Sequence, residues 1–302
     1  MKAGGVRAIW IVLIFVWGST WLFIKVGLEN LPPFTFAGVR FVIALAPLCL
    51  LAVLRGAKIP SKLSDWGLLA ATGFLTFTCG YGLVFWGEQY LSSGLTAVYF
   101  TTYPLAGLLF AHWLLPSEPL SARRLAGALL ALAGVVVIFA DQLDFQGPMA
   151  AWGSVAVLVS ALGGALSGVL LKSRGSHLDP LIVSLFQMAI GGLPLLVIGL
   201  LIDGNPFALD WTPKAVFSLF YLALVGTSLA FVLWYRLLQA TMVTKAQFMP
   251  VLNTLVAVLL GALVLHESYG WRAAAGTAAV LCGAAISLWK NNGAVVSQPL
   301  SE

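Results

Sequence analysis

EPLSARRLAGALLALAG, residues 118–134, contains a spacing of charged and small residues that occurs again in ESYGWRAAAGTAAVLCG, residues 267–283. In both stretches a glutamate is followed by an arginine and two glycines at the same separations, and the offset between the copies is 149. A recurrence at half the chain length indicates a duplicated structural unit. We therefore predict one repeat over residues 1–145 and a second over residues 146–302.

The composition predicts that both repeats lie in a membrane. Hydrophobic residues make up 60% of the 302 residues and charged residues 9%, and the mean hydropathy is +0.98. A span of about 20 apolar residues crosses the hydrocarbon core as a helix, because every backbone polar group must be satisfied internally. The apolar runs predict an all-α fold with ten spans, at 8–24, 34–54, 66–87, 94–115, 123–140, 149–171, 180–202, 213–235, 244–265 and 271–289.

The number of spans in each repeat decides how the two repeats are related. Five spans bring the second copy into the membrane in the opposite sense, so we predict inverted repeats related by a pseudo-two-fold axis in the membrane plane. Such repeats can pack in two near-equivalent ways, one open to each side, which is the basis of alternating access.

The distribution of Lys and Arg predicts the orientation. Of the 16 such residues, 12 fall on the side of the N-terminus, 3 on the other side, and Arg40 within the second span. Because cytoplasmic loops of membrane proteins carry an excess of Lys and Arg, we expect both termini in the cytoplasm.

Particular motifs give the chain a resemblance to a known family. They are Trp17-Gly18-Ser19-Thr20-Trp21 with Lys25, the pair Arg40-Phe41, and the doubled Glu/Arg/Gly/Gly spacing. The chain resembles the ten-helix exporters of the drug/metabolite transporter superfamily that are built from two EamA-type repeats, and within them the bacterial aromatic amino-acid exporters. The resemblance implies a location in the bacterial inner membrane, a central cavity, and export of aromatic and other apolar amino acids.

Other classes of function lack their sequence signatures. The chain contains no G-x-x-x-x-G-K-[ST] loop, so transport would be passive or ion-coupled. Ser167-Gly168 lacks the rest of a G-x-S-G protease element, and the three histidines lie far apart without metal-ligand spacing. We expect no enzyme activity, no metal and no cofactor.

Arg40 is the one basic residue well inside a span, where an unpartnered charge costs about 2.5–3.5 kcal/mol on insertion scales. One interpretation is a clamp for a substrate carboxylate, because a guanidinium offers paired donors. The alternative is a structural partner for backbone carbonyls or for Glu88. An offset of 147 aligns Arg40 with Gln187, so the second repeat keeps a donor without the charge.

Aromatic residues at helical spacing inside the spans are candidates for lining the cavity, where they would stack on an aromatic side chain or hold a cation. The alternative is packing between neighbouring helices. The aromatic candidates are Trp17, Trp21, Tyr81, Phe85, Trp86, Tyr99, Tyr103, Trp234 and Tyr235.

Polar residues within spans add candidates, among them Ser19, Thr20, Ser160, Gln187, Ser228, Gln247 and Asn253. Gln247 precedes Pro250 by three residues, and Thr101 and Pro104 fall in the corresponding stretch of the first repeat. Because proline interrupts the helical hydrogen-bond ladder, we predict that Thr101, Pro104 and Pro250 take part in gating. Glu118 near Arg123 and Glu267 near Arg272 are interpreted as ion pairs that close the ends of the bundle.

The sequence therefore predicts an inner-membrane secondary transporter of small apolar metabolites. Its expected partners are a small-molecule substrate and the lipid bilayer, with no nucleic acid, and we expect a monomer. An exchanger of phosphorylated or nucleotide-linked metabolites is the nearest alternative, although such a cavity would need several Lys or Arg. A channel-like facilitator is the second alternative.

Overall fold

The computed structural model describes residues 3–91, 93–140, 147–264 and 271–289, and these ranges contain helices and turns but no strand. The predicted all-α class is confirmed for this part of the chain. Short turns join the helices, and prolines stand at the first residue of several of them. Proline suits that position because the first N–H groups of a helix have no partner within it.

Continuous helices form most of the bundle. They follow the apolar stretches of the sequence, because in a membrane the backbone must satisfy its own hydrogen bonds. They are α1 (Ala3–Leu28), α2 (Pro33–Leu54), α7 (Ala122–Ile138), α8 (Pro148–Arg174), α9 (Pro180–Ile202) and α14 (Trp271–Leu288), with a short 3-10 turn, η3 (Pro206–Ala208), between α9 and the next helix.

Two long helical runs change their winding in the middle. In the first run α3 (Leu63–Gly73) continues through the π-helical segment η1 (Phe74–Tyr81) into α4 (Gly82–Glu88), and in the second α10 (Pro213–Ala223) continues through η4 (Leu224–Leu229) into α11 (Ala230–Ala240). Moving η1 by the repeat offset of 149 places it over 223–230, which contains η4. π-Helical turns occur frequently at functional sites, so their matching positions in the two halves make the middle of these runs a candidate functional region.

Two further helices are broken. Thr101 and Thr102 separate α5 (Ser93–Phe100) from α6 (Tyr103–Leu114), and Gln247 and Phe248 separate α12 (Val243–Ala246) from α13 (Met249–Val264). Pro104 and Pro250 are each the second residue of the helix that follows the break. The structure therefore places both breaks within four residues of the prolines that were assigned to gating.

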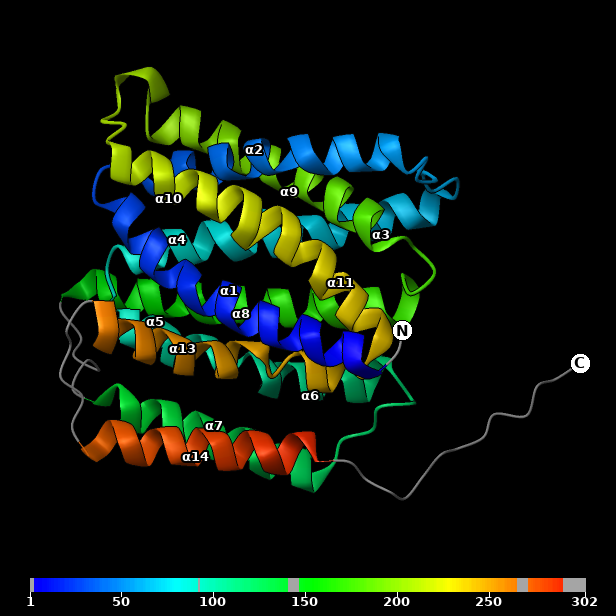
Figure 1. Cartoon of the computed structure of the whole chain (residues 1–302), viewed down its shortest axis with the longest axis vertical. Coiled ribbons are helices and arrows are strands. Elements are labelled where there is room, and N and C mark those ends of the chain that lie inside the picture. The colour runs from blue at the N-terminus through cyan, green and yellow to red at the C-terminus, as the bar shows by residue number, and fades with distance from the viewer. Residues whose placement is uncertain (1–2, 92, 141–146, 265–270, 290–302) are drawn as a thin grey trace, which may run out of the picture.

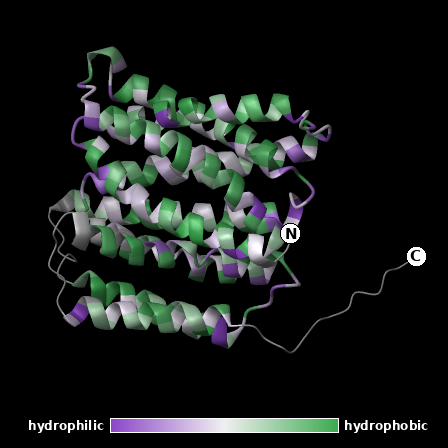
Figure 2. Cartoon of the chain, in the orientation of Figure 1, coloured by the Kyte–Doolittle hydropathy of each residue, from purple (hydrophilic) through white to green (hydrophobic). Residues whose placement is uncertain are grey.

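Six helical runs in the described residues are long and apolar enough to cross a membrane: Gly4–Leu28, Pro33–Leu54, Leu63–Glu88, Met149–Arg174, Pro180–Ile202 and Pro213–Ala240. Apolar residues cover these helices along their lengths, and hydrophilic residues gather at helix ends and turns (Figure 2). The remaining predicted spans are shorter: α7 has 17 residues, the apolar part of α14 is Ala274–Leu288, and two helices are broken, so the total of ten spans stays a prediction.

The helices lie side by side in one bundle, with α2 and α9 along one edge and α7 and α14 along the opposite edge (Figure 1). Glycines allow α7 and α14 to approach closely. A methyl group added at Gly127 would lie 2.6 Å from the carbonyl oxygen of Gly283, and one at Gly134 would lie 2.7 Å from that of Gly276. Because the earlier glycine of α7 meets the later glycine of α14, the two helices run antiparallel.

The predicted ion pair between Glu118 and Arg123 is wrong. The carboxylate of Glu118 accepts hydrogen bonds from the backbone N–H of Val243 at 2.7 Å and from Thr244, and its residue is 3% exposed. Arg123 instead donates to the backbone carbonyl of Trp289 at 2.9 Å. The start of a helix supplies unpaired N–H groups, and these compete for the carboxylate at close range. Glu267 lies outside the described residues.

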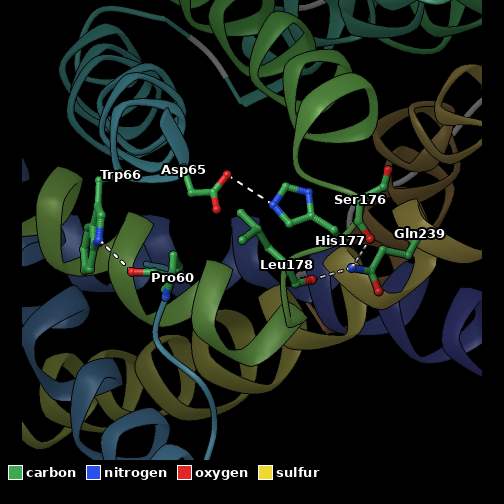
Figure 3. Close-up of polar contacts among 7 residues, drawn as sticks. All are labelled: Pro60, Asp65, Trp66, Ser176, His177, Leu178 and Gln239. Carbon is green, nitrogen blue, oxygen red and sulfur yellow. Dashed lines mark hydrogen bonds and ion pairs between the residues drawn. The ribbon is translucent and has the colours of Figure 1, made fainter. Parts of the chain in front are cut away.

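Further contacts join the helices at the end of the bundle that carries the N-terminus (Figures 1 and 3). The ring Nε2 of His177, in the turn between α8 and α9, lies 3.1 Å from Oδ1 of Asp65 in α3. The side-chain amide of Gln239 in α11 donates to the carbonyl oxygen of Leu178 at 2.6 Å. These contacts connect the turn between α8 and α9 to α3 and α11.

Candidate functional site

A cavity of about 130 Å³ lies in the middle of the bundle. Its walls come from both halves of the chain, with α1, η1, α4, α5 and α6 from the first half and α8, α11 and α13 from the second. The two π-containing runs and the two broken helices all contribute to it. The residues that line the cavity in the described part of the chain include no Asp, Glu, Lys or Arg.

The structure brings most of the predicted aromatic residues together around this cavity. Those that line it are Trp17, Trp21, Tyr81, Phe85, Tyr103, Trp234 and Tyr235. Phe100 and Phe231 also line it, and sequence reasoning missed both. Phe231 could have been found, because it precedes Trp234 and Tyr235 by three and four residues and therefore shares their helix face.

Trp17 is held in place by several contacts. Its indole N–H donates to the carbonyl oxygen of Gly226 at 3.3 Å. Its ring lies 5.4 Å from the ring of Trp234 and 5.7 Å from that of Phe231, at angles of 56° and 65°. Tilted and edge-on ring contacts of this kind are favourable, so α1 and α11 meet through aromatic side chains at the cavity.

The structure places Arg40 behind the cavity wall and not on it. The residue is 1% exposed, its Nε donates to Oγ1 of Thr227 at 2.7 Å, and its Nη2 donates to the carbonyl oxygen of Gly226 at 3.4 Å. Its guanidinium carbon lies 5.2 Å from the ring centre of Tyr81, which lines the cavity. Nη1 is buried without a hydrogen-bond partner in the described structure. The charge therefore lies one side chain away from the cavity.

Gln187 and Gln247 are buried, are not among the lining residues, and bond to other groups of the protein. Gln187 accepts from the hydroxyl of Tyr235 and donates to that of Thr72, and Gln247 donates to the carbonyl oxygen of Ala165 at 2.8 Å. Gln187 thus positions Tyr235, one of the aromatic residues on the cavity wall.

The remaining predicted residues lie at different distances from the cavity. Trp86 packs against Tyr90, with ring centres 5.2 Å apart, and neither Trp86 nor the half-buried Tyr99 is among the lining residues. Of the residues assigned to gating, Pro250 lines the cavity, while Thr101 and Pro104 are buried next to it in the broken helix that carries Phe100 and Tyr103.

Comparison with known proteins also divides the chain into two similar halves. The model of the EamA-like transporter family matches twice, over residues 6–140 and 151–289. The chain is 28% identical to the uncharacterized transporter YoaV of Bacillus subtilis (strain 168), with 90% of this chain and 93% of that protein covered. It is 31% identical to a probable amino-acid metabolite efflux pump of Escherichia coli (strain K12), with 88% of each chain covered.

A solved crystal structure shares the fold. It superimposes with a TM-score of 0.79 over 94% of this chain and 96% of its own, at 18% sequence identity. With both halves matched by one family model, the protein belongs to the EamA-like transporter family and is a multi-pass membrane transporter of the drug/metabolite transporter superfamily.

Proposed function

We propose that this protein exports aromatic and other apolar amino acids, or closely related metabolites, across the bacterial inner membrane by alternating access. The observation that carries the proposal is the uncharged, aromatic cavity at the interface between the two halves. Such walls suit a substrate with an aromatic or apolar body. The 31% identity to a probable amino-acid metabolite efflux pump supports the direction and class of transport.

The mechanism requires ten spans in two inverted repeats, at 1–145 and 146–302. Support for the inversion comes from α7 and α14, which carry the repeated glycines and pack antiparallel through them. α2 and α9 likewise occupy corresponding positions in the two repeats and pack against each other. If the two repeats exchange conformations, a cavity that is open to one side of the membrane becomes open to the other side.

Arg40 supports recognition of the carboxylate end of such a substrate. Its charge has no acidic partner among the described residues, and it lies behind Tyr81 at a distance where its field reaches the cavity. We assign it a positioning role through Tyr81, in place of direct clamping. Trp17, Trp21, Tyr81, Phe85, Tyr103 and Trp234 would then hold the apolar part of the substrate.

Phosphorylated metabolites fit this cavity less well. A phosphate group usually requires several Lys or Arg side chains, and none lines the cavity in the described structure. A carrier of aromatic amino acids needs apolar and aromatic side chains on the cavity walls, whereas an exchanger of sugar phosphates needs basic ones.

The test is counterflow in proteoliposomes that contain the purified protein. Labelled phenylalanine, tryptophan and a sugar phosphate are each offered outside against the unlabelled compound inside, with and without a pH gradient. We expect saturable counterflow of the two amino acids and none of the sugar phosphate. Flux that does not saturate would indicate a channel-like facilitator, and no flux of any apolar amino acid would end the proposal.

A further inference from the structure

Asn253 lines the cavity, and its side-chain amide has an oxygen that the protein itself does not bond. It lies in α13, three residues after Pro250, and both residues line the cavity. The residue is 5% exposed, and its Oδ1 is buried without a hydrogen-bond partner in the described structure. An unpaired amide is costly away from water, and more so in a membrane, where no solvent replaces the missing bond.

Three aliphatic hydroxyl groups of the same walls are already bonded within the protein. Thr20 donates to the carbonyl of Trp17 at 2.7 Å, Ser160 donates to that of Gly80 at 2.8 Å, and Ser167 donates to that of Thr72 at 3.2 Å. Their protons are therefore used within the protein. Asn253 supplies the only side-chain amide among the lining residues described, and an amide oxygen can accept two hydrogen bonds.

The chemistry of the cavity decides which part of a substrate needs such an acceptor. Aromatic faces attract the ammonium group of an amino acid, but they leave its N–H donors without an oxygen partner. The positive charge of Arg40, behind Tyr81 of η1, disfavours an ammonium group near that wall and favours a carboxylate there. Asn253 lies on a different helix, α13, and offers the oxygen.

We propose that Asn253 is a specificity-determining residue that accepts hydrogen bonds from the ammonium group of the transported amino acid. This inference rests on the proposed function. It also predicts the orientation of the bound substrate, with its ammonium group at α13 and its carboxylate towards η1. Asn253 then selects amino acids and amines over apolar compounds that have the same aromatic body but no N–H donor at this position.

The experiment measures competition with labelled tryptophan in counterflow by three unlabelled compounds: tryptophan, tryptamine, which lacks the carboxylate, and indole-3-propionate, which lacks the ammonium group. Asn253→Leu replaces the amide with an apolar group of similar size. We expect its competition constants for tryptophan and tryptamine to rise about 10- to 100-fold, since a hydrogen bond to a charged group is lost, and that for indole-3-propionate to change less than about twofold.

Two further variants serve as controls. Asn253→Asp keeps an oxygen acceptor, so its competition constant for tryptamine should stay close to that of the unaltered protein. This variant also provides a test if Asn253→Leu does not fold. Thr254→Val removes the neighbouring hydroxyl, which bonds the carbonyl of Val251 at 2.7 Å and does not line the cavity, and should change none of the three constants.

The outcomes separate this inference from the proposed function. An equal rise for all three compounds would assign Asn253 a structural role, and a rise for indole-3-propionate alone would show that the amide binds the carboxylate. Either result overturns the inference while the protein remains an amino-acid carrier. If the unaltered protein shows no tryptophan counterflow, the proposed function itself is wrong.

Discussion

The carboxylate of Glu118 accepts two hydrogen bonds from Thr244, one from its backbone N–H at 2.9 Å and one from its hydroxyl at 2.5 Å. Glu118 follows α6 in the first repeat, and Thr244 lies in the first turn of α12 in the second. Arg124 also donates to the Thr244 hydroxyl, at 2.9 Å. A buried carboxylate therefore ties the two broken helices of the bundle together at one end.

Glu118→Ala should loosen this end of the bundle. The substitution leaves the buried N–H groups of Val243 and Thr244 without an acceptor, at a cost of about 1–3 kcal/mol for each unsatisfied group. We expect a lower Tm for the purified protein in detergent. Glu118→Gln keeps one oxygen acceptor and should fall between Glu118→Ala and the unaltered protein, and equal Tm values for all three proteins would contradict the assigned contact.

Gly127→Leu should separate α7 from α14. A side chain at this position would enter the backbone of α14 at Gly283 and Ser287, where no flexible atom can move aside. We expect the protein to lose its monodisperse peak in gel filtration or to melt well below the unaltered protein. Gly67→Leu is the control, because a Cβ at Gly67 meets nothing within 4 Å, and it should leave the peak and the Tm unchanged.

The sequence predicts the helices and the cavity aromatics better than it predicts the partners of buried polar groups. Apolar runs and the doubled glycine spacing depend on local pattern, which a single chain displays directly. Arg40 shows the limit, because its bonding partner Thr227 lies 187 residues away in the chain. Helical periodicity places Arg40 on one face of α2, but it does not say which helix of the other repeat covers that face.

The helix breaks near Pro104 and Pro250 are a second feature that the sequence predicts only in part. Proline predicts an interrupted helix, but not that the interruption leaves two separate segments with the residues before it buried between other helices. The π-helical segments η1 and η4 carry no proline and were not predicted, because their winding depends on packing against neighbouring helices.

Pro250→Ala should slow transport more than it weakens substrate binding. Alanine allows α12 and α13 to join as one helix, which stiffens the segment that we predict to take part in gating. We expect the maximal rate of counterflow to fall about tenfold and KM to change less, because a hinge substitution acts mainly on the rate of the conformational step but often on both quantities. Pro47→Ala, in α2 and away from the cavity lining, should change neither quantity. A Pro250→Ala protein with normal rates would remove Pro250 from gating.

Site-directed labelling should test the orientation. Asn205 lies in the exposed connection between α9 and α10, and Lys58 lies in the exposed connection between α2 and α3. In a background in which Cys49, Cys79 and Cys282 are replaced by alanine, a membrane-impermeant thiol reagent added to intact cells should label a cysteine at 205 and not one at 58. Labelling of 58 alone would reverse the proposed topology and place both termini outside.

Arg40→Gln should weaken binding of compounds that carry a carboxylate. Glutamine is the residue that the second repeat has at the corresponding position, Gln187, so the variant removes the charge and keeps a donor for Thr227. With the positive charge behind Tyr81 gone, we expect the competition constants of tryptophan and indole-3-propionate to rise about tenfold, or about 1.4 kcal/mol.

The response of tryptamine separates a substrate-directed role of Arg40 from a structural one. Tryptamine has no carboxylate, so loss of the nearby positive charge should leave its binding unchanged or strengthen it. A variant in which all three compounds bind more weakly, and whose Tm also falls, would assign Arg40 to the packing of α2 against η4. Because Asn253→Leu and Arg40→Gln are expected to act on opposite ends of the same substrate, the two variants should show opposite preferences between tryptamine and indole-3-propionate.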